Sequence, residues 1–428
     1  MKRLLSVFLS AVMLATVSVL GIISGCGNTT TLRICNWEDY ISVDEESGET
    51  LAEEFEQYYL DKTGQKIKVE YSTFGTCEEL YNTLKIEGDV YDLICPSDYM
   101  IEKMAREDML EKLELSIGGN YNKNLSPYIK SVFESIKWGE NGENNLSQYA
   151  AGYMWGTMGL VYNSAKVSDN DMKSYSSLWN NDSFKNKFTI KDSVRDTYFI
   201  CLAKVFENEL KSLDKTAPDY NQKLTSYFNA TDSSTIEKVR TALTTLKSRS
   251  KGMEVDSGKN DIVNGNIDVY FAWSGDAVYS MNEAETENVT LKYSVPEEGS
   301  NVWFDGWCIP KGSSQKALAQ EFIDFISSTE NAVKNMDYIG YVSCMAGDGI
   351  YDYVKQTYGV DNGVHSVDLS YFFSGEQVGD YVVKTNTLGR QFSAQYPSFD
   401  VINRCAVMSY FNDNANTKIN EMWMAVKA

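Results

Sequence analysis

The sequence predicts an α/β protein with a mostly parallel sheet and two domains. Strand-like and helix-like segments alternate between residues 32 and 95, an order typical of a parallel sheet covered by helices. About 400 residues remain beyond the N-terminal segment, more than one ordinary hydrophobic core holds. Two apolar strand-like runs, 149–163 and 302–310, lie far apart in the sequence. We expect the chain to pass between the two domains at these runs.

Local patterns define the elements of the first domain. Three strand-like runs alternate with two helix-like runs, with strands at 32–36, 66–72 and 90–95 and helices at 50–62 and 78–86. Gly64 is placed to end the first helix, and Leu80 and Leu84 have the spacing of an inward helix face. Pro96 directly follows the third strand and halts it.

The rest of the chain continues the alternation and divides it into lobes. Residues 115–147 are polar and rich in Asn and Gly, so we expect a hairpin or mobile surface loop there. Helices are expected within 197–251 and over 316–328. The expected division has a hinge between two lobes: 26–158 form lobe 1, 159–300 form lobe 2, 301–342 return to lobe 1, and 343–428 pack mainly on lobe 2.

The first 26 residues have the features of an export signal with a lipid attachment site. Lys2 and Arg3 precede an apolar run over 4–23, and small residues then lead to Cys26. Ser-Gly-Cys26 resembles a lipobox, in which the cysteine is acylated and becomes the first mature residue. We expect 1–25 to be removed and a lipid on Cys26 to tether the protein at the outer face of the cytoplasmic membrane, or in the periplasm. An uncleaved anchor is the alternative, because the apolar run is about 20 residues long.

The charge of the chain argues against a nucleic acid as partner. The net charge is −21, and removing residues 1–25 takes away two positive charges and no acids, which leaves −23. Such a surface repels nucleic acids and anionic membranes and attracts cations. Aromatic residues make up 13% of the chain and include 28 Tyr, so rings are available to line a cleft.

The cysteines and the single histidine exclude several kinds of site. With Cys26 acylated, an odd number of widely spaced cysteines remains, without a C-x-x-C pair. One disulfide among them stays open. His365 is the only histidine, which leaves little for a histidine-based metal site or for Ser-His-Asp catalysis. We expect no metal and no cofactor.

Three clusters combine aromatic rings with carboxylates and indicate a site for an organic cation. They are Trp37-Glu38-Asp39-Tyr40, Trp273-Ser-Gly-Asp276 and Trp303-Phe304-Asp305. A ring presents a negative face to a cation, and a carboxylate supplies the counter-charge. One such cluster is more often a core ring beside a solvated acid, but three of the same composition favour a polyamine site. The first cluster and Ser97-Asp98-Tyr99 follow predicted strands, where ligands bind in parallel sheets.

The order of these motifs resembles the spermidine/putrescine-binding proteins of ABC importers. The matching landmarks are Asn36–Tyr40, Tyr91–Tyr99, Tyr153–Asn163, Asp192–Asp196, Trp273–Asp276, Trp303–Pro310 and Ile339–Tyr341. The resemblance implies a two-lobed type II periplasmic-binding-protein fold that closes over a linear amine. It also implies an ABC permease and its ATPase as partners, and a binding protein that acts as a monomer.

The resemblance assigns ligand-binding roles position by position. It places rings along the methylene chain at Trp37, Tyr40, Trp273 and Trp303, and carboxylates for the ammonium groups at Asp39, Asp196, Asp276 and Asp305. Ser97, Tyr99 and Tyr341 would supply hydroxyl groups and walls. Glu38 departs from the family pattern and is either an extra carboxylate or a residue that points away. Asp39 with Asp276 resembles the diamine pattern and Trp303 the spermidine pattern, so the ligand's length stays open.

Two other function classes remain as alternatives. Paired carboxylates beside Trp also occur in glycosidases, but the acids here come in repeated clusters and not as one acid/base pair. A sugar-binding protein is the second alternative, because Trp faces stack on sugar rings. Anion and ferric-ion binders require basic residues, or paired Tyr with His, and fit less well. We expect no enzyme activity, with Trp155 and Trp307 in the core and Asp92 and Arg195 in structural contacts.

Overall fold

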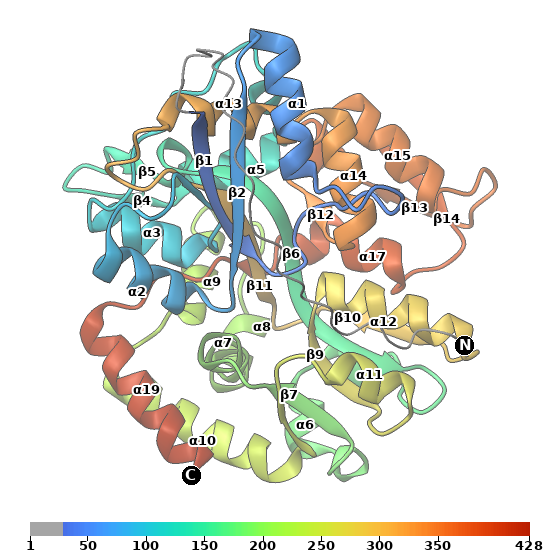
Figure 1. Ribbon diagram of the computed structural model, residues 1–428. Coiled ribbons are helices and arrows are strands. Elements are labelled where there is room, and N and C mark those ends of the chain that lie inside the picture. The colour runs from blue at the N-terminus through green and yellow to red at the C-terminus, as the bar shows by residue number, and fades with distance from the viewer. Residues whose placement is uncertain (1–28) are drawn as a thin grey trace, which may run out of the picture.

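Strand β6 (Ala151–Asn163) connects the two halves of the molecule (Figure 1). The computed structural model describes residues 29–428, so the expected export signal and Cys26 lie outside the described residues. All 13 residues of β6 are buried. Met154 and Trp155 pack in one hydrophobic core, whereas Leu160 and Tyr162 pack in another. We call the bodies around these cores the first lobe and the second lobe.

The first lobe begins with the expected alternation of strands and helices. Its elements are β1 (Thr30–Trp37), α1 (Leu51–Thr63), β2 (Ile67–Phe74), α2 (Cys77–Glu87) and β3 (Leu93–Ile94). The strands are parallel in the order β2-β1-β3, which confirms the predicted β-α-β-α-β succession. The third strand, expected over 90–95, is only two residues long. Asp92 instead binds Arg33, and Pro96 offers no N–H for a longer ladder.

Side-chain caps fix where the first two helices start. Thr50 and Thr76 accept hydrogen bonds from the N–H groups of Glu53 and Glu79, and both glutamates bond back to the capping residue. Gly64 ends α1 in the left-handed conformation, with φ at 72°. These caps explain why both helices agree with the predicted ranges to within two residues.

A larger sheet runs through both lobes. Its order is β15 (Cys405–Ala406), β11 (Ser300–Trp307), β6, β9 (Val269–Trp273), β7 (Phe188–Lys191) and β8 (Gly252–Glu254), and β10 (Leu291–Ser294) and β12 (Val342–Ser343) also pair with β6. β6 is antiparallel to β11 and β9, whereas β7 is parallel to β8 and β9. The register of β6 and β11 shifts between Asp305 and Gly306, a β-bulge.

Residues 115–147 contain helices as well as the expected hairpin. α4 (Asn120–Asn124) and α5 (Pro127–Ser135) precede the hairpin of β4 (Lys137–Trp138) and β5 (Asn144–Asn145). The expectation of a hairpin or mobile loop is therefore incomplete. Ser126 caps α5, and Ile129 and Phe133 are buried on its inner face. Two apolar residues one helical turn apart are a weak signal in a segment rich in Asn and Gly.

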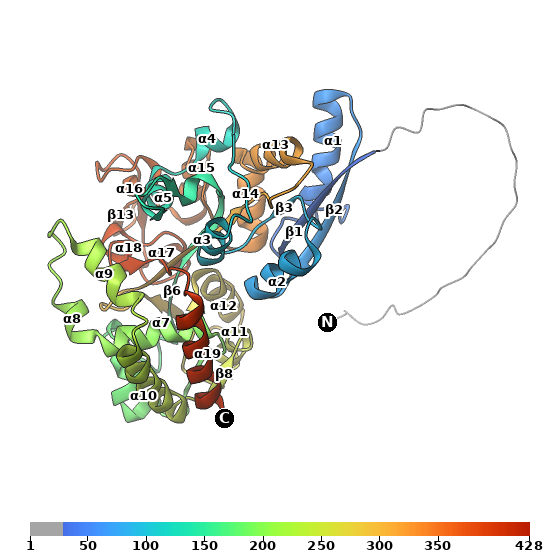
Figure 2. The same ribbon diagram turned by 90° about the vertical axis from the view of Figure 1, so that its left-hand side faces the viewer.

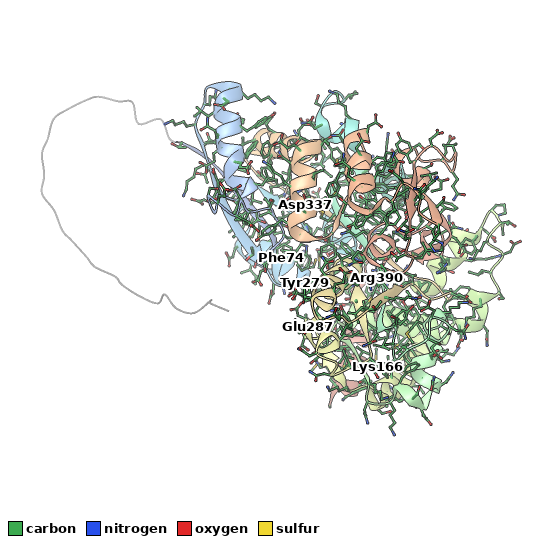
Figure 3. The ribbon with its side chains drawn as sticks, turned by 90° about the vertical axis from the view of Figure 1, so that its right-hand side faces the viewer. Phe74, Lys166, Tyr279, Glu287, Asp337 and Arg390 are labelled. Carbon is green, nitrogen blue, oxygen red and sulfur yellow. The ribbon has the colours of Figure 1, made fainter. Side chains whose placement is uncertain are left out.

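The remaining helices cover the sheet in both lobes (Figures 1 and 2). They are α3 (Asp98–Arg106), α6 (Ser176–Asn180), α7 (Val194–Val205), α8 (Glu207–Lys211), α9 (Tyr220–Phe228), α10 (Ser233–Arg249), α11 (Gly258–Val263), α12 (Ser274–Thr286), α13 (Lys316–Ile326), α14 (Thr329–Ile339), α15 (Asp348–Tyr358), α16 (Ser370–Phe373), α17 (Gln391–Gln395), α18 (Phe399–Ile402) and α19 (Asp413–Lys427). Short 3-10 turns lie at Leu146–Gln148, Asp171–Lys173 and Asp182–Phe184, and β13 (His365–Asp368) pairs with β14 (Val382–Thr385). In Figure 3, Asp337 marks the first lobe, Lys166 marks the second, and Tyr279 lies on α12 between them.

The C-terminal segment packs differently from the expectation. We expected residues 343–428 to pack mainly on the second lobe, but most of their buried residues up to Ile402 belong to the core of the first lobe. Phe372 stacks on Trp155 with ring centroids 5.2 Å apart, and Tyr371 packs on Tyr128. Only the end of the chain, with α19 beside α10 and α7, joins the second core (Figure 2). Sequence spacing gives no signal for such long-range ring contacts.

Several other expectations concern buried residues. Trp155 and Trp307 are fully buried, as predicted. The seven cysteines among residues 29–428 are free thiols, and Cys405 is the one of them that is not fully buried. Within the same residues, no helix is long and apolar enough to span a membrane.

A buried ion pair joins β1 to the residues before β3. Asp92 is fully buried, and its carboxylate accepts hydrogen bonds from the Arg33 guanidinium at 2.9 and 3.0 Å and from Ser313 at 2.9 Å. Burial would raise the pKa of Asp92, but the Arg33 hydrogen bonds hold it below its usual value. Asp92 is therefore structural, as expected.

We predict that Asp92→Ala lowers the free energy of unfolding by about 2–4 kcal/mol, because it leaves the Arg33 guanidinium and the Ser313 hydroxyl without their acceptor. Chemical denaturation measures this loss. Asp361→Ala, at an exposed turn, is the control and should be neutral. Equal stability of the two variants would contradict the structural role of Asp92.

Candidate functional site

Asp305 is the centre of the candidate site. It lies on β11 at the β-bulge opposite β6, and its side chain is buried, with 5% exposure. The Ser97 hydroxyl donates to Oδ1 at 2.7 Å, and the Tyr40 hydroxyl donates to Oδ2 at 2.7 Å. A bulge next to a functional residue commonly re-aims its side chain. Three residues that the sequence assigned to the ligand thus meet at one carboxylate.

The described residues around Asp305 disfavour the ionised form of its carboxyl group and supply no cation to pair with it. Burial raises the pKa of this carboxyl to about 6, and the hydrogen bonds from Ser97 and Tyr40 oppose that rise. No Lys, Arg or His of residues 29–428 lies within 4 Å of its oxygens in an ion pair. Two hydroxyl groups leave lone pairs on a carboxylate, so Asp305 can still accept hydrogen bonds from a cation.

Three aromatic rings stand beside this carboxylate. The Tyr341 ring meets Trp303 edge-on at 5.2 Å and Tyr40 edge-on at 5.8 Å. Gly156 makes room for Trp303, because a Cβ there would lie 2.7 Å from the indole. Gly275 does the same for Tyr341, whose ring occupies the space that a Cβ would need. These two glycines let rings from β11 and from the end of α14 approach β6 and α12 closely.

A second carboxylate, Asp276, lies on the far side of Tyr341. The Tyr341 hydroxyl is 3.4 Å from Asp276 Oδ1, and the Lys191 ammonium is 3.4 Å from Oδ2. Lys259 lies 3.8 Å from Oδ1. Asp276 sits in the first turn of α12, where the helix dipole favours a negative charge. The same Lys191 ammonium stands 4.3 Å from the centre of the Trp273 ring.

Asp196, in the first turn of α7, lies close to Lys191 and Trp273, the neighbours of Asp276. Ser193 caps the helix by accepting the Asp196 N–H. Burial raises the pKa of Asp196, whereas Ser193, Lys191 and Trp273 act to lower it. Asp196 therefore lies near Lys191 and Trp273, and its contact with the ligand stays a prediction.

Tyr99 joins the two lobes through a cation–π contact that the sequence did not predict. The Arg195 guanidinium on α7 stands 3.8 Å from the Tyr99 ring on α3 and 4.1 Å from the Phe411 ring. Arg195 also donates to the Ser409 carbonyl. Asp98, which precedes Tyr99, is buried and accepts the N–H of Phe304 at 3.1 Å, so it holds α3 against β11. Burial raises the pKa of Asp98 well above its usual value.

Only part of the first aromatic cluster, Trp37–Tyr40, lies at this site. Tyr40 reaches Asp305, but Trp37 packs on Phe74, with centroids 4.5 Å apart. Glu38 and Asp39 have exposed side chains and take part in none of the hydrogen bonds described above. Asp39 has a left-handed backbone, with φ at 52°. These two acids lie directly after β1, and their contact with the ligand stays a prediction.

Sequence reasoning missed Lys191, Lys259 and Glu254. Glu254 lies 3.9 Å from the Lys191 ammonium, and burial raises the pKa of its carboxyl. One signal was available for Lys191, because it immediately precedes the Asp192–Asp196 motif. No signal was available for the other two, which are separated from every motif that carried the resemblance.

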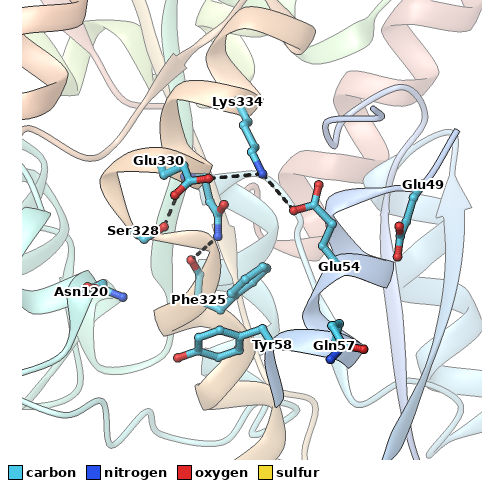
Figure 4. A pocket seen from close by; sticks show the side chains of 10 residues that line it. Glu49, Glu54, Gln57, Tyr58, Asn120, Phe325, Ser328, Glu330 and Lys334 are labelled. Carbon is cyan, nitrogen blue, oxygen red and sulfur yellow. Dashed lines mark hydrogen bonds and ion pairs between the residues drawn. The ribbon is translucent and has the colours of Figure 1, made fainter. Parts of the chain in front are cut away.

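A surface pocket lies elsewhere, between α1 and α14 (Figure 4). Its lining includes Lys334, which pairs with Glu54 at 2.9 Å and with Glu330 at 3.6 Å. None of the sequence-predicted ligand residues lines it. We do not assign a cationic ligand to this pocket, because two of its carboxylates, Glu54 and Glu330, are already paired with Lys334. Among residues 29–428, no group of three His, Cys, Asp or Glu is arranged to hold a metal ion.

Comparisons with known proteins agree with the resemblance. Residues 50–347 match the family described as bacterial extracellular solute-binding protein, over more than half of the chain. The spermidine/putrescine-binding periplasmic protein of Salmonella typhimurium is 28% identical over 313 residues, covering 73% of this chain and 76% of that protein. The putrescine-binding periplasmic protein of Pseudomonas aeruginosa is 28% identical over 329 residues, covering 76% of this chain and 80% of that protein.

A solved structure supports the fold assignment. The spermidine/putrescine ABC transporter substrate-binding protein of Streptococcus pneumoniae matches with a TM-score of 0.64 at 24% identity, covering 93% of this chain and 99% of that chain. The two-lobed type II periplasmic-binding-protein fold is therefore confirmed.

We predict that Tyr40→Phe raises the pKa of Asp305 above its value of about 6, because it removes one of the two hydroxyls that stabilise the charged carboxylate. Carboxyl ¹³C NMR titration measures the pKa, and Asp305→Asn identifies the resonance. Tyr71→Phe is the control, since the Tyr71 hydroxyl bonds Asn36 instead. A pKa that is unchanged or lower in Tyr40→Phe would show that this hydroxyl does not stabilise the carboxylate.

Proposed function

Because the chain belongs to the family of bacterial extracellular solute-binding proteins, we propose that it binds a polyamine, putrescine or spermidine, between its two lobes. The family acts outside the cytoplasm and binds solutes without catalysing their conversion, so the chain is not an enzyme. The observation that carries the proposal is the uncompensated Asp305 carboxylate, held by Ser97 and Tyr40 beside the rings of Trp303 and Tyr341.

The chemistry of this carboxylate suits an ammonium group. A buried ammonium ion costs several kcal/mol to desolvate unless a carboxylate pairs with it. Asp305 would supply that charge, and the ring faces would cover the methylene chain and add about 0.5–2 kcal/mol of cation–π attraction. The names of the relatives, which bind spermidine and putrescine, support the same ligand class.

The proposal includes closure of the lobes around the ligand. Tyr40 packs in the first core, whereas α7 and β9, which hold Asp196 and Trp273, contribute residues to the second core. A ligand that touches both lobes therefore favours the closed form. We propose a hinge at β6 and β11, a monomer as the binding unit, and delivery of the amine to an ABC permease driven by its ATPase. Glu38 and Asp39, exposed at the end of β1, would take a further ammonium group on closure.

A thermal-shift panel tests the proposed ligand. Putrescine, spermidine and cadaverine are expected to raise the melting temperature, because a ligand that binds only the folded state stabilises it. Amino acids, sugars and sodium chloride at matched ionic strength are the controls. Stabilisation by a neutral sugar and by no amine would replace the proposal with a sugar-binding protein.

We predict that Asp305→Asn weakens amine binding by about 2–4 kcal/mol, the usual cost of removing one partner of a desolvated ion pair. Isothermal titration calorimetry measures the affinity. Asp361→Asn, at an exposed turn, is the matched control. Equal affinities of the Asp305 and Asp361 variants would place the amine elsewhere.

We predict that amine affinity falls as the pH falls through about 6. Asp305 binds the amine only when ionised, and its carboxyl has a raised pKa of about 6, so binding is full above pH 7 and declines below 6. The decline approaches about tenfold per pH unit for one proton. Calorimetry from pH 8 to pH 5 measures this decline in affinity. The same titration of Asp305→Asn shows how much of the decline comes from other acids. A flat profile in the unmodified protein would contradict the assignment.

We further propose that Cys26 carries a lipid that anchors the protein outside the cytoplasmic membrane. We predict that Cys26→Ser moves the protein from the membrane fraction to the soluble fraction, because the acyl chains provide the membrane affinity. Cell fractionation with immunodetection measures the distribution, and Cys35→Ser is the matched control. Membrane retention of Cys26→Ser would favour an uncleaved apolar anchor.

A further inference from the structure

One end of the proposed amine site already holds a cation of the chain. The Lys191 side chain is 1% exposed, and its ammonium donates to the Val255 carbonyl at 2.6 Å. It lies 3.4 Å from Asp276, 3.9 Å from Glu254 and 4.3 Å from the centre of the Trp273 ring. A carboxylate, a carbonyl and a ring face are the groups that would bind the ammonium of a ligand.

The position of Lys191 is built into the sheet. Lys191 is the last residue of β7 and pairs in register with Glu254 of β8. Its carbonyl accepts the hydroxyl of Thr197, a fully buried residue of α7, at 2.6 Å. The backbone is thus fixed on both sides, and the side chain extends from the carboxyl end of the strand, where ligands bind in such sheets.

The charges at the two ends of the site differ as a result. Asp276 faces two ammonium groups within 4 Å, those of Lys191 and Lys259. Asp305 faces only the neutral hydroxyls of Ser97 and Tyr40 within hydrogen-bond distance. A cation of the ligand therefore gains a counter-charge at Asp305, but it meets like charges at Asp276.

We infer that Lys191 is a specificity-determining residue that occupies the ammonium subsite at Asp276 and Trp273. The inference rests on the proposed polyamine function and narrows it. The site then favours a short diamine that binds through Asp305, and it disfavours spermidine, whose further aminopropyl arm would bring an ammonium group against Lys191. Lys191 acts here as a tethered amine of the chain itself.

Titration of the unmodified protein and of Lys191→Met with putrescine and spermidine tests the inference. We expect the unmodified protein to bind putrescine more tightly, and Lys191→Met to bind spermidine roughly tenfold more tightly than before, because a like charge has left the subsite. Putrescine affinity should change much less. Lys238→Met, at an exposed position of α10, is the matched control and should change neither.

Two further variants separate subsite occupancy from a general effect on folding. Lys191→Met removes the cation nearer to Asp276 and the cation paired with Glu254, and Lys259 remains near Asp276. The variant should have a lower melting temperature, and spermidine should restore it more than sodium at equal ionic strength. Lys191→Arg keeps the charge and should keep the preference for putrescine. Lys191→Met combined with Asp276→Asn lacks the carboxylate and should not gain spermidine affinity.

Each outcome supports or overturns the inference. A gain of spermidine binding in Lys191→Met that the double variant loses would support it. If both amines bind but their affinity ratio is the same in the unmodified protein and Lys191→Met, the inference fails and the polyamine function stands. If neither amine binds any variant while all remain folded, the proposed function fails and the inference fails with it.

Discussion

A buried carboxylate without a cation is the constraint on which the candidate site depends. Asp305 is held by two neutral hydroxyls, and burial keeps the pKa of its carboxyl near 6. Such a group is costly for the folded protein when it is ionised, and a cation that enters the site removes part of that cost. The hydroxyls come from the N-cap of α3 and from the loop after β1, so the first β-α units hold the carboxylate in place. The β-bulge lets β11 present it at the junction of the lobes.

Contacts from both lobes converge on that junction. β6 contributes buried residues to both cores, so the lobes share a strand while each keeps its own packing. Gly275 allows the Tyr341 ring, from the first lobe, to lie against α12, which lies between the lobes. The Arg195 guanidinium on α7 reaches the Tyr99 ring on α3 in the same way. Contacts that cross between two separately packed bodies can break and form again without unfolding either core.

The sequence predicted local structure and motif residues better than packing. Gly64 and the period of apolar residues made α1 and α2 predictable to within two residues. The resemblance had assigned Ser97, Tyr40 and Asp305 to one ligand site; Ser97 and Tyr40 each follow a strand, whereas Asp305 lies within β11. The packing of residues 344–402 on the first lobe was not predictable, since it depends on ring contacts such as Phe372 with Trp155. Lys259 and Glu254 were missed because their proximity to Asp276 arises only when β8, α11 and α12 pack together.

Lys191 illustrates how a motif-level resemblance can persist while the electrostatics of a site change. The ring of Trp273 and the carboxylate of Asp276 both match the resemblance, and by themselves they indicate a subsite for a ligand's ammonium group. One residue before the neighbouring motif, however, supplies an ammonium group that meets both of them. A carboxylate that is already paired offers a second cation little, because the first has met most of its charge and repels the newcomer. The selectivity of such a cleft therefore depends on which of its carboxylates the chain leaves unpaired, and Asp305 is one of these.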